Sequence, residues 1–213
     1  MSPDDPHGGQ PILFAGAQVG EAKGAMILVH GRGADARDIL GLAEYFGRPD
    51  LAYVAPEAAG HTWYPNRFLV PVEENEPYLS SALGVLDTLV DDIGRGGLGA
   101  ERVFLLGFSQ GACLSLEFAA RNPRRYGGVI ALSGGLIGAS VKADNYSGSL
   151  AGTPVFLGCS DVDPHIPLAR VKESSTIMAA LGGAVTERIY PGMGHTVTGD
   201  EVEEVVKMLA GVA

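Results

Sequence analysis

A serine flanked by glycines is the residue in this sequence best placed for nucleophilic chemistry. The pattern G-x-S-x-G occurs as Gly107-Phe108-Ser109-Gln110-Gly111, between an apolar run (102–108) and a run with helical spacing (110–121). A strand that turns abruptly into a helix exposes the serine hydroxyl, and the glycines leave room for neighbouring backbone. The helix N-terminus also places amide groups where an oxyanion would form. The sequence predicts that Ser109 is a nucleophile, with a purely structural turn as the alternative.

A serine hydroxyl needs a base, and five histidines are available. In a strand-turn-helix site of this kind the acid and then the histidine follow the serine, so His30 and His61 stand in the wrong order. His7 belongs to an N-terminal segment expected to be flexible, and His165 lies too close to the acid candidates to occupy a separate loop. We therefore predict that His195, in the loop PGMGH, is the base, with an exposed loop histidine as the alternative.

Two aspartates are candidates for the acid that orients the base. Asp161 and Asp163 both follow the apolar run PVFLGCS, at the end of a predicted strand. Pro164 favours an extended backbone at Asp163 and a sharp turn, whereas Asp161 suits a turn or capping position. We predict that Asp163 is the acid and keep Asp161 as the alternative.

A glycine-rich turn, HGRGAD, follows the first strong apolar strand. Its backbone can direct the Arg32 amide toward an oxyanion, together with the amide of Gln110, the residue after the serine. The Arg32 side chain is expected to be a solvated surface arginine, and contact with a carboxylate on the substrate is the alternative.

Aromatic residues lie in the irregular segment 61–78, which is rich in proline and polar residues. Trp63, Tyr64 and Phe68 are candidates for the wall of a substrate pocket. The alternative, equally favoured, is that they anchor a long loop to the core.

Short apolar runs alternate with helical patterns along the chain and predict one α/β domain spanning residues 1–213, with residues 1–10 flexible. Strands that are apolar throughout indicate a mostly parallel sheet, and right-handed crossovers then give a three-layer α/β/α sandwich. Strands are expected at 25–30, 51–55, 102–108, 128–132, 154–158 and 185–190, and helices at 35–46, 78–93, 110–121, 168–181 and 200–209.

Composition limits the partners of the chain. The 213 residues carry a net charge of −10, which disfavours nucleic acid and anionic membranes. Cys113 and Cys159 lie in apolar segments and are expected to be buried free thiols. The first ten residues lack the features of a signal peptide, and no apolar run approaches a membrane span, so a cytoplasmic protein without stable membrane association is expected. The histidines show no HExxH spacing, so no metal site is predicted.

The motifs LVHGRGAD, GFSQGACLSLEFA, DVDPHIPLARV and YPGMGH resemble those of the phospholipase/carboxylesterase family, over most of the chain. The resemblance implies a minimal α/β-hydrolase fold without a cap, no cofactor and frequent homodimers. It also places the acid at Asp163 and the base at His195. The short, polar segment 134–153 likewise lacks room for a cap and predicts an open site.

The expected function is a serine carboxylesterase acting on a small-molecule ester through an acyl-enzyme. Arg32 stands where relatives more often carry an apolar or small residue, which favours short-chain or aryl esters over long acyl chains. Two alternatives stay open: a thioesterase or lysophospholipase with the same apparatus, and a ligand-binding sensor on a hydrolase frame.

Overall fold

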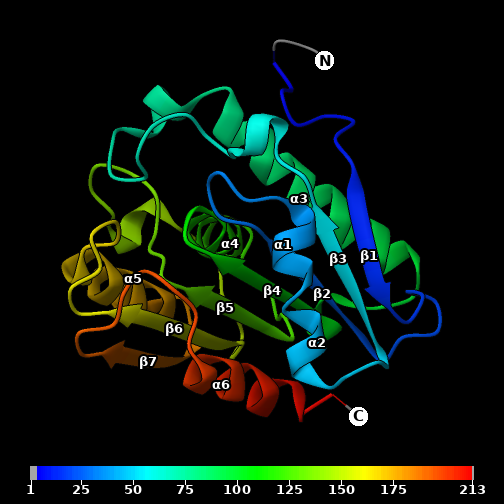
Figure 1. Ribbon diagram of the computed structural model, residues 1–213. Helices are drawn as coiled ribbons and strands as arrows, with labels where there is room; N and C mark the ends of the chain where they lie inside the picture. Colours follow the sequence, from blue (N-terminus) through cyan, green and yellow to red (C-terminus); the bar gives the residue numbers. More distant parts are fainter. Residues whose placement is uncertain (1–3, 213) are drawn as a thin grey trace.

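Seven strands form one sheet in the computed structural model, which describes residues 4–212 (Figure 1). Their order across the sheet is β1-β3-β2-β4-β5-β6-β7. The strands are β1 (Ile12–Gly16), β2 (Gly24–Val29), β3 (Leu51–Pro56), β4 (Val103–Phe108), β5 (Gly128–Leu132), β6 (Pro154–Ser160) and β7 (Ala184–Tyr190). β1 pairs antiparallel with β3, and the other neighbours are parallel, which confirms the predicted mostly parallel sheet.

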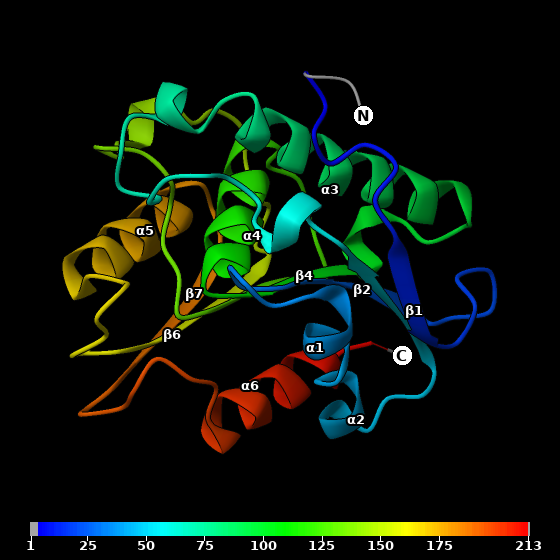
Figure 2. The same cartoon turned by 45° about the horizontal axis from the view of Figure 1, so that its top comes forward.

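Helices cover both faces of the sheet (Figure 2). The helices are α1 (Ala36–Leu40), α2 (Ala43–Phe46), α3 (Tyr78–Arg95), α4 (Gln110–Arg121), α5 (Leu168–Ala180) and α6 (Gly199–Leu209). Short 3-10 turns occur at Ala59–His61, Val72–Asn75, Ala100–Arg102 and Ala143–Asn145. Helices α3, α4 and α5 lie on one face, and α1, α2 and α6 on the other, so the predicted three-layer sandwich is confirmed. None of the helices within residues 4–212 is long and apolar enough to cross a membrane.

The central strands are apolar throughout because both of their faces are buried. In β2, Ala25, Ile27 and Val29 pack with the core under α3, α4 and α5. The alternate residues Met26 and Leu28 pack with the core under α1, α2 and α6. Successive side chains of a strand point to opposite faces of the sheet, and here each of the two sets packs against a helical layer.

Two local features differ from the sequence prediction. β1 is an additional strand, at an edge of the sheet, and its alternating exposure leaves Phe14 66% exposed. The single helix expected over 35–46 is broken into α1 and α2. Asp35 is not helical but caps α1, and α1 ends at Gly41, a residue that destabilises helices.

The segment before β1 is packed, unlike the flexible segment expected for residues 1–10. It lies beside α3, and His7 is only 1% exposed (Figure 1). The His7 amide donates to Ser81 Oγ at 3.0 Å, and that hydroxyl donates to Asp5 at 2.6 Å. The expectation is wrong from Asp4 onward because these polar contacts and burial of the imidazole hold the segment. Residues 1–3 lie outside the described residues.

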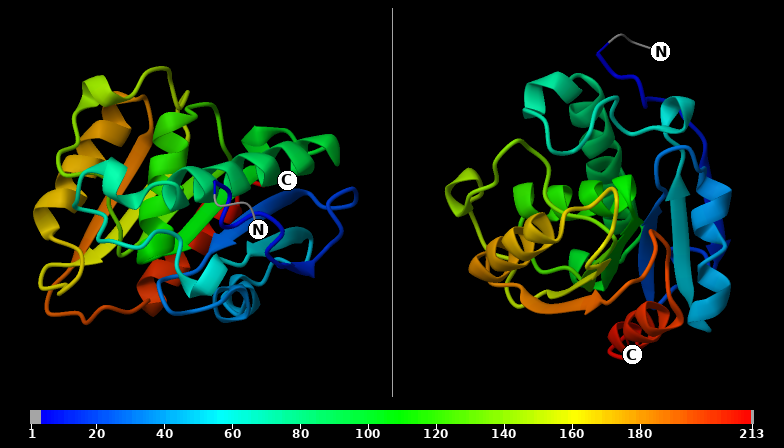
Figure 3. Two further views of the ribbon diagram at one scale, coloured as in Figure 1. Left: turned by 90° about the horizontal axis from the view of Figure 1, so that it is seen from above. Right: turned by 60° about the vertical axis from the view of Figure 1, so that its left-hand side comes forward.

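The ends of the parallel strands place the predicted site at one edge of the sheet, whose twist is visible in Figure 3. Arg32, Ser109, Asp163 and His195 follow β2, β4, β6 and β7 respectively. The carboxyl ends of parallel strands point the same way, and this edge is where open α/β sheets bind ligands. Between β5 and β6 the chain forms only the short turn Ala143–Asn145, so no helical cap is inserted there.

Helix α4 approaches the sheet closely because two glycines remove the intervening side chains. A Cβ atom at Gly107 would lie 2.2 Å from the backbone carbon of Gly111. A Cβ atom at Gly111 would lie 2.0 Å from the carbonyl oxygen of Val29 in β2. Such distances are incompatible with any side chain, so the glycines permit the turn that carries Ser109.

We expect Gly111→Ala to lower the free energy of unfolding by about 3 kcal/mol or more, because the methyl group must displace the β2 backbone. Gly84→Ala is the matched control. Gly84 lies in α3 with no atom within 4 Å of an added Cβ, and its replacement is expected to leave stability unchanged or raise it by up to about 1 kcal/mol. Urea denaturation measures both. Equal stability of the two variants would contradict the close-packed turn.

Candidate active site

Ser109 occupies a strained turn between β4 and α4. Its backbone has φ 55° and ψ −117°, a conformation that L-residues rarely adopt. Its amide donates to Leu132 O of β5 at 2.9 Å, which ties the turn to the neighbouring strand. The surrounding strands and helix therefore hold the serine in a conformation that projects its hydroxyl out of the turn.

The loop that carries His195 is held by residues at the end of β6. Ser160 Oγ donates to Met193 O at 2.5 Å, and the Gly192 amide donates to Asp161 Oδ1 at 2.8 Å. Asp161, the alternative candidate for the acid, thus orients the histidine loop through its backbone. After the loop, Thr198 caps α6 and fixes the other end.

Three side chains from separate loops form a continuous chain of hydrogen bonds. His195 Nδ1 lies 2.7 Å from Asp163 Oδ2, and His195 Nε2 lies 2.8 Å from Ser109 Oγ. An ionised carboxylate can only accept, so the imidazole proton resides on Nδ1 and Nε2 is free to accept the serine proton. The structure therefore brings together the three residues predicted as nucleophile, base and acid.

The carboxyl group of Asp163 is buried and yet held in its charged form. Burial by itself would raise the pKa, but the hydrogen bond from His195 and the amides of His165 and Ile166 outweigh it and lower the pKa of Asp163. These amides donate to Oδ1 at 2.8 and 3.0 Å, which leaves Oδ2 for the imidazole. The tight turn after Pro164 thus orients the acid.

Two backbone amides beside Ser109 remain available for an oxyanion. No backbone hydrogen bond engages the Arg32 amide in the described part of the chain. The Gln110 amide lies in the first turn of α4, where helix geometry provides no acceptor. The two segments lie close together, since a Cβ atom at Gly31 would lie 3.4 Å from Ser109 Cβ.

The side chains of Arg32 and Gln110 hold the loop that faces the serine. The Arg32 guanidinium donates to the carbonyls of Tyr64, Pro65 and Asn66 at 2.7, 3.0 and 2.7 Å. Gln110 Oε1 accepts from the Trp63 amide at 2.9 Å, and its Nε2 donates to Tyr64 O at 2.8 Å. Arg32 is exposed, as expected for a surface arginine, and three loop carbonyls fix its guanidinium.

Trp63 does not form part of the substrate cavity, which corrects its candidate role as a pocket wall. Its ring is fully buried between His7 and His30, with ring centroids 5.3 and 5.0 Å away. Its indole N–H donates to His30 O at 2.9 Å. His7 Nε2 lies 2.9 Å from Trp63 O, so the N-terminal segment helps to anchor this loop. Trp63 therefore anchors the loop to the core, which was the alternative role, because its ring is buried and its indole N–H bonds to a buried carbonyl.

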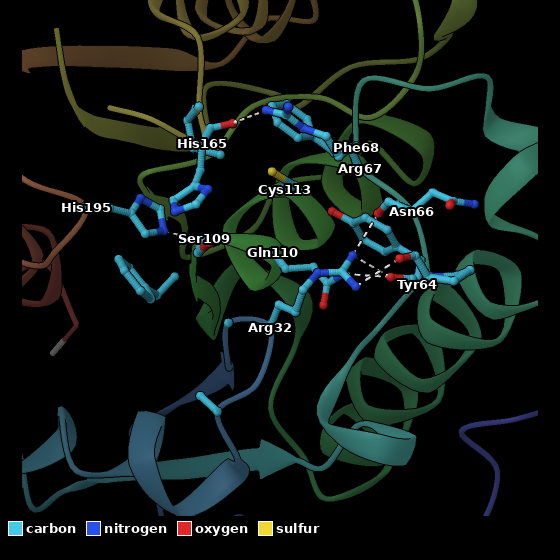
Figure 4. A pocket seen from close by; sticks show the side chains of 15 residues that line it. Arg32, Tyr64, Asn66, Arg67, Phe68, Ser109, Gln110, Cys113, His165 and His195 are labelled. Atoms are coloured by element: carbon cyan, nitrogen blue, oxygen red, sulfur yellow. Dashed lines mark hydrogen bonds between the residues drawn. The ribbon is translucent and has the colours of Figure 1, made fainter. Parts of the chain in front are cut away.

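A cavity of about 530 Å³ opens beside Ser109 and His195 (Figure 4). Its lining includes Tyr64 and Phe68, two of the three predicted pocket residues. The other lining residues are Gly31, Arg32, Ala34, Pro65, Asn66, Arg67, Phe108, Gln110, Cys113, His165 and Ile166. The nucleophile and base are thus exposed to a space with aromatic walls and a polar rim.

Some of these lining residues were missed by the sequence analysis. The His165 ring packs edge-on against His195, with centroids 4.8 Å apart. Its position two residues after the predicted acid could have placed it near the site. Cys113 and Cys159 are buried and free, as predicted, and burial raises the pKa of each thiol to about 12. Within residues 4–212, no group of three His, Cys, Asp or Glu side chains is arranged to hold a metal ion.

The sheet, the helical layers and the sharp turn at Ser109 are those of an α/β hydrolase. Residues 16–212 match the model of the phospholipase/carboxylesterase family, and the chain belongs to this family. It is a hydrolase of the carboxylesterase/acyl-protein thioesterase type.

Relatives and solved structures agree with this assignment. The crystal structure of a phospholipase/carboxylesterase from Dyadobacter fermentans has a TM-score of 0.91 and 43% identity, over 94% of this chain and 96% of that one. Acyl-protein thioesterase 1 of Saccharomyces cerevisiae is 26% identical over 92% of this chain and 96% of its own length. Acyl-protein thioesterase 1 of Gibberella zeae is 36% identical, over 53% of this chain and 49% of its own length.

The contacts of His7 predict a pH-dependent contribution to stability. Burial lowers the pKa of His7 below its ordinary value of 6.5, so in the folded state the imidazole stays neutral where the unfolded chain already binds a proton. Its stabilising contribution is therefore complete above about pH 6.5 and declines as the pH falls toward the folded pKa. We expect His7→Gln to be less stable than wild type at pH 7.5, with a gap that narrows by up to about 1.4 kcal/mol per pH unit below pH 6.5.

Ser81→Ala provides the control for His7→Gln, because it removes the acceptor of the His7 amide and leaves the imidazole in place. Its deficit in free energy of unfolding should stay constant between pH 7.5 and 5. Urea denaturation at several pH values measures both gaps. A constant gap for His7→Gln would show that burial does not depress the titration of this imidazole.

Proposed function

We propose that this chain is a serine carboxylesterase that hydrolyses carboxylic esters through an acyl-enzyme, with Ser109, His195 and Asp163 as its catalytic triad. The observation that carries the proposal is the hydrogen-bond chain from Asp163 through His195 to Ser109, at 2.7 and 2.8 Å. It ends at a cavity beside two available amides. This is the arrangement that makes a serine hydroxyl nucleophilic.

In the first half-reaction Ser109 Oγ attacks the ester carbonyl carbon and transfers its proton to His195 Nε2. The carbonyl oxygen becomes an oxyanion, which the amides of Arg32 and Gln110 stabilise by hydrogen bonds. Asp163 stabilises the imidazolium that forms and keeps its orientation. The imidazolium then gives its proton to the leaving alkoxide oxygen, and the alcohol departs to leave an acyl-serine.

In the second half-reaction a water molecule replaces the alcohol. His195 Nε2 takes one proton of the water as its oxygen attacks the acyl carbon, and the same amides hold the new oxyanion. Collapse of this intermediate breaks the bond to Ser109 Oγ, which regains a proton from His195. The carboxylic acid leaves, and the enzyme returns to its starting state.

Short-chain or aryl esters suit the cavity. Phe108 gives it aromatic surface next to Ser109, and the largely buried Tyr64 and Phe68 lie in its wall. The loop of Tyr64 is fixed by Arg32 and Gln110, so a long acyl chain cannot easily open it further. The exposed lining residues Arg32 and Arg67 are charged, which disfavours a long apolar chain across the rim.

Thioester hydrolysis is the second candidate, because matched relatives are named acyl-protein thioesterases. The same nucleophile, base and amides would serve a thioester, whose leaving group is a thiolate in place of an alkoxide. Turnover of matched oxygen and thiol esters separates these two substrates. A ligand-binding sensor on this frame would instead bind esters without sustained turnover.

We expect the wild type to turn over p-nitrophenyl esters in a C2 to C12 acyl series, with the highest kcat/KM for short chains. Ser109→Ala should lose about 10⁴-fold or more in kcat, because the nucleophile is removed. The matched control is Ser115→Ala, also in α4, where the replaced hydroxyl is buried with no hydrogen-bond partner among residues 4–212. Its activity should stay near that of wild type. Ester turnover that survives Ser109→Ala would overturn the proposal.

Replacing each of the two neighbouring aspartates by asparagine tests the assignment of the acid. In Asp163→Asn an amide would favour the wrong imidazole tautomer, and kcat should fall by about 10⁴-fold. In Asp161→Asn the amide oxygen can still accept from the Gly192 amide, so we expect a loss of less than about tenfold. Losses of similar size in steady-state kinetics would show that Asp163 has no special role.

A further inference from the structure

The charge of the catalytic cavity is opposite to that of the whole chain. The chain has a net charge of −10, yet the cavity lining contains two arginines, Arg32 and Arg67, and no aspartate or glutamate. His165 and His195 also line it. The Asp163 side chain, the nearest carboxylate in the mechanism, is fully covered beneath His195. The cavity therefore carries local positive charge, whereas the chain as a whole is negatively charged.

The two arginines of the cavity differ in how they are bound. The Arg32 guanidinium donates to three loop carbonyls at 3.0 Å or less, so three of its five N–H donors are committed to the loop. The Arg67 guanidinium makes one long hydrogen bond, 3.4 Å, to His165 O. Figure 4 shows Arg67 directed toward the main chain of His165, while Arg32 turns toward Tyr64 and Asn66.

Arg67 is exposed at the cavity, and within residues 4–212 no carboxylate forms an ion pair with it. Its guanidinium can leave His165 O at the cost of one weak hydrogen bond. A planar guanidinium with several free N–H groups matches a carboxylate or phosphate in a bidentate geometry. Neutral ester substrates offer no such partner, so the hydrolysis of simple esters leaves this group unused.

We propose that Arg67 is a specificity-determining residue that binds an anionic group, a carboxylate or phosphate, on the substrate ester. The inference rests on the proposed function and adds a substrate class to it: esters whose acyl or alcohol part carries a negative charge at its far end. Ser109 attacks the ester carbonyl while Arg67 holds the charged end at the rim. Arg32 adds positive charge from its fixed position.

The test compares two esters that differ in one terminal group. Mono-p-nitrophenyl adipate carries a carboxylate at the end of a six-carbon acyl chain, and p-nitrophenyl hexanoate is its neutral counterpart. The adipate chain is long enough to avoid the rapid self-hydrolysis that a five- or six-membered anhydride ring would allow. Each kcat/KM is divided by the alkaline hydrolysis rate of the same ester. We expect wild type to prefer the anionic ester by about tenfold or more.

Three variants assign this preference to Arg67. Arg67→Met keeps the aliphatic stem and should remove the preference by lowering kcat/KM for the adipate, while kcat/KM for the hexanoate does not fall. Arg67→Lys should retain part of it, since the charge remains without the fork. Arg95→Gln removes an arginine at the end of α3, outside the cavity lining, and should leave the preference unchanged. Equal loss on both esters in Arg67→Met would show that Arg67 only braces the His165 loop and would overturn the inference.

A second pair of esters places the anion on the other side of the scissile bond. In 3-acetoxybenzoate the carboxylate belongs to the leaving phenol, and methyl 3-acetoxybenzoate is its neutral counterpart. If only this pair shows a preference that depends on Arg67, the charged group belongs to the alcohol part of the substrate. If only the adipate pair shows it, the charged group belongs to the acyl part. Absence of a preference in both pairs, with turnover intact, contradicts this inference only. Absence of turnover on all four esters contradicts the proposed function itself.

Discussion

The close approach of α4 to β2 and β4 is the constraint on which the rest of the site depends. Gly107 and Gly111 allow backbone to meet backbone where any Cβ atom would collide. That contact forces the chain to reverse direction within one residue, so Ser109 takes a positive φ. Because the turn lies at the carboxyl end of a central strand, the hydroxyl emerges beside the loops of β6 and β7. The strain at one residue thus follows from the packing of three elements.

Side-chain hydrogen bonds fix the loop that forms one wall of the cavity relative to the turn at Ser109. The side chains of Arg32 and Gln110, whose amides are the proposed oxyanion donors, bond to the carbonyls of residues 64–66 and to the Trp63 amide. His7 supports the same loop from behind through Trp63. The main chains of two residues are therefore available to the substrate, while their side chains maintain the loop. This arrangement couples the shape of the cavity to the position of its hydrogen-bond donors.

The sequence predicted the parts of the fold that follow from local periodicity. The apolar central strands, the amphipathic helices and the order of Ser109, Asp163 and His195 each leave a pattern in the residues. β1 did not, because an edge strand buries only alternate residues and its five residues resemble a loop. The role of Trp63 was left open between pocket wall and loop anchor, since a buried indole and an exposed one look alike in sequence. The packing of His7 depends on Ser81, 74 residues away, and no local pattern reports such a contact.

The arginines at the rim of the cavity are distinct from the residues that the α/β-hydrolase fold places around Ser109. In the proposed mechanism Ser109, His195 and Asp163 act on the carbonyl, and the loops that follow β4, β6 and β7 set their positions. The rim is built differently: Arg32 is bound by three carbonyls, and Arg67 by one long contact. Arg67 approaches the hydrogen-bond chain that reaches Ser109 through the main chain of His165. In an acidic protein, a guanidinium without an ion pair at that rim attracts anions locally while the remaining surface repels them. Selection among esters can therefore depend on a charged group that lies away from the reacting bond.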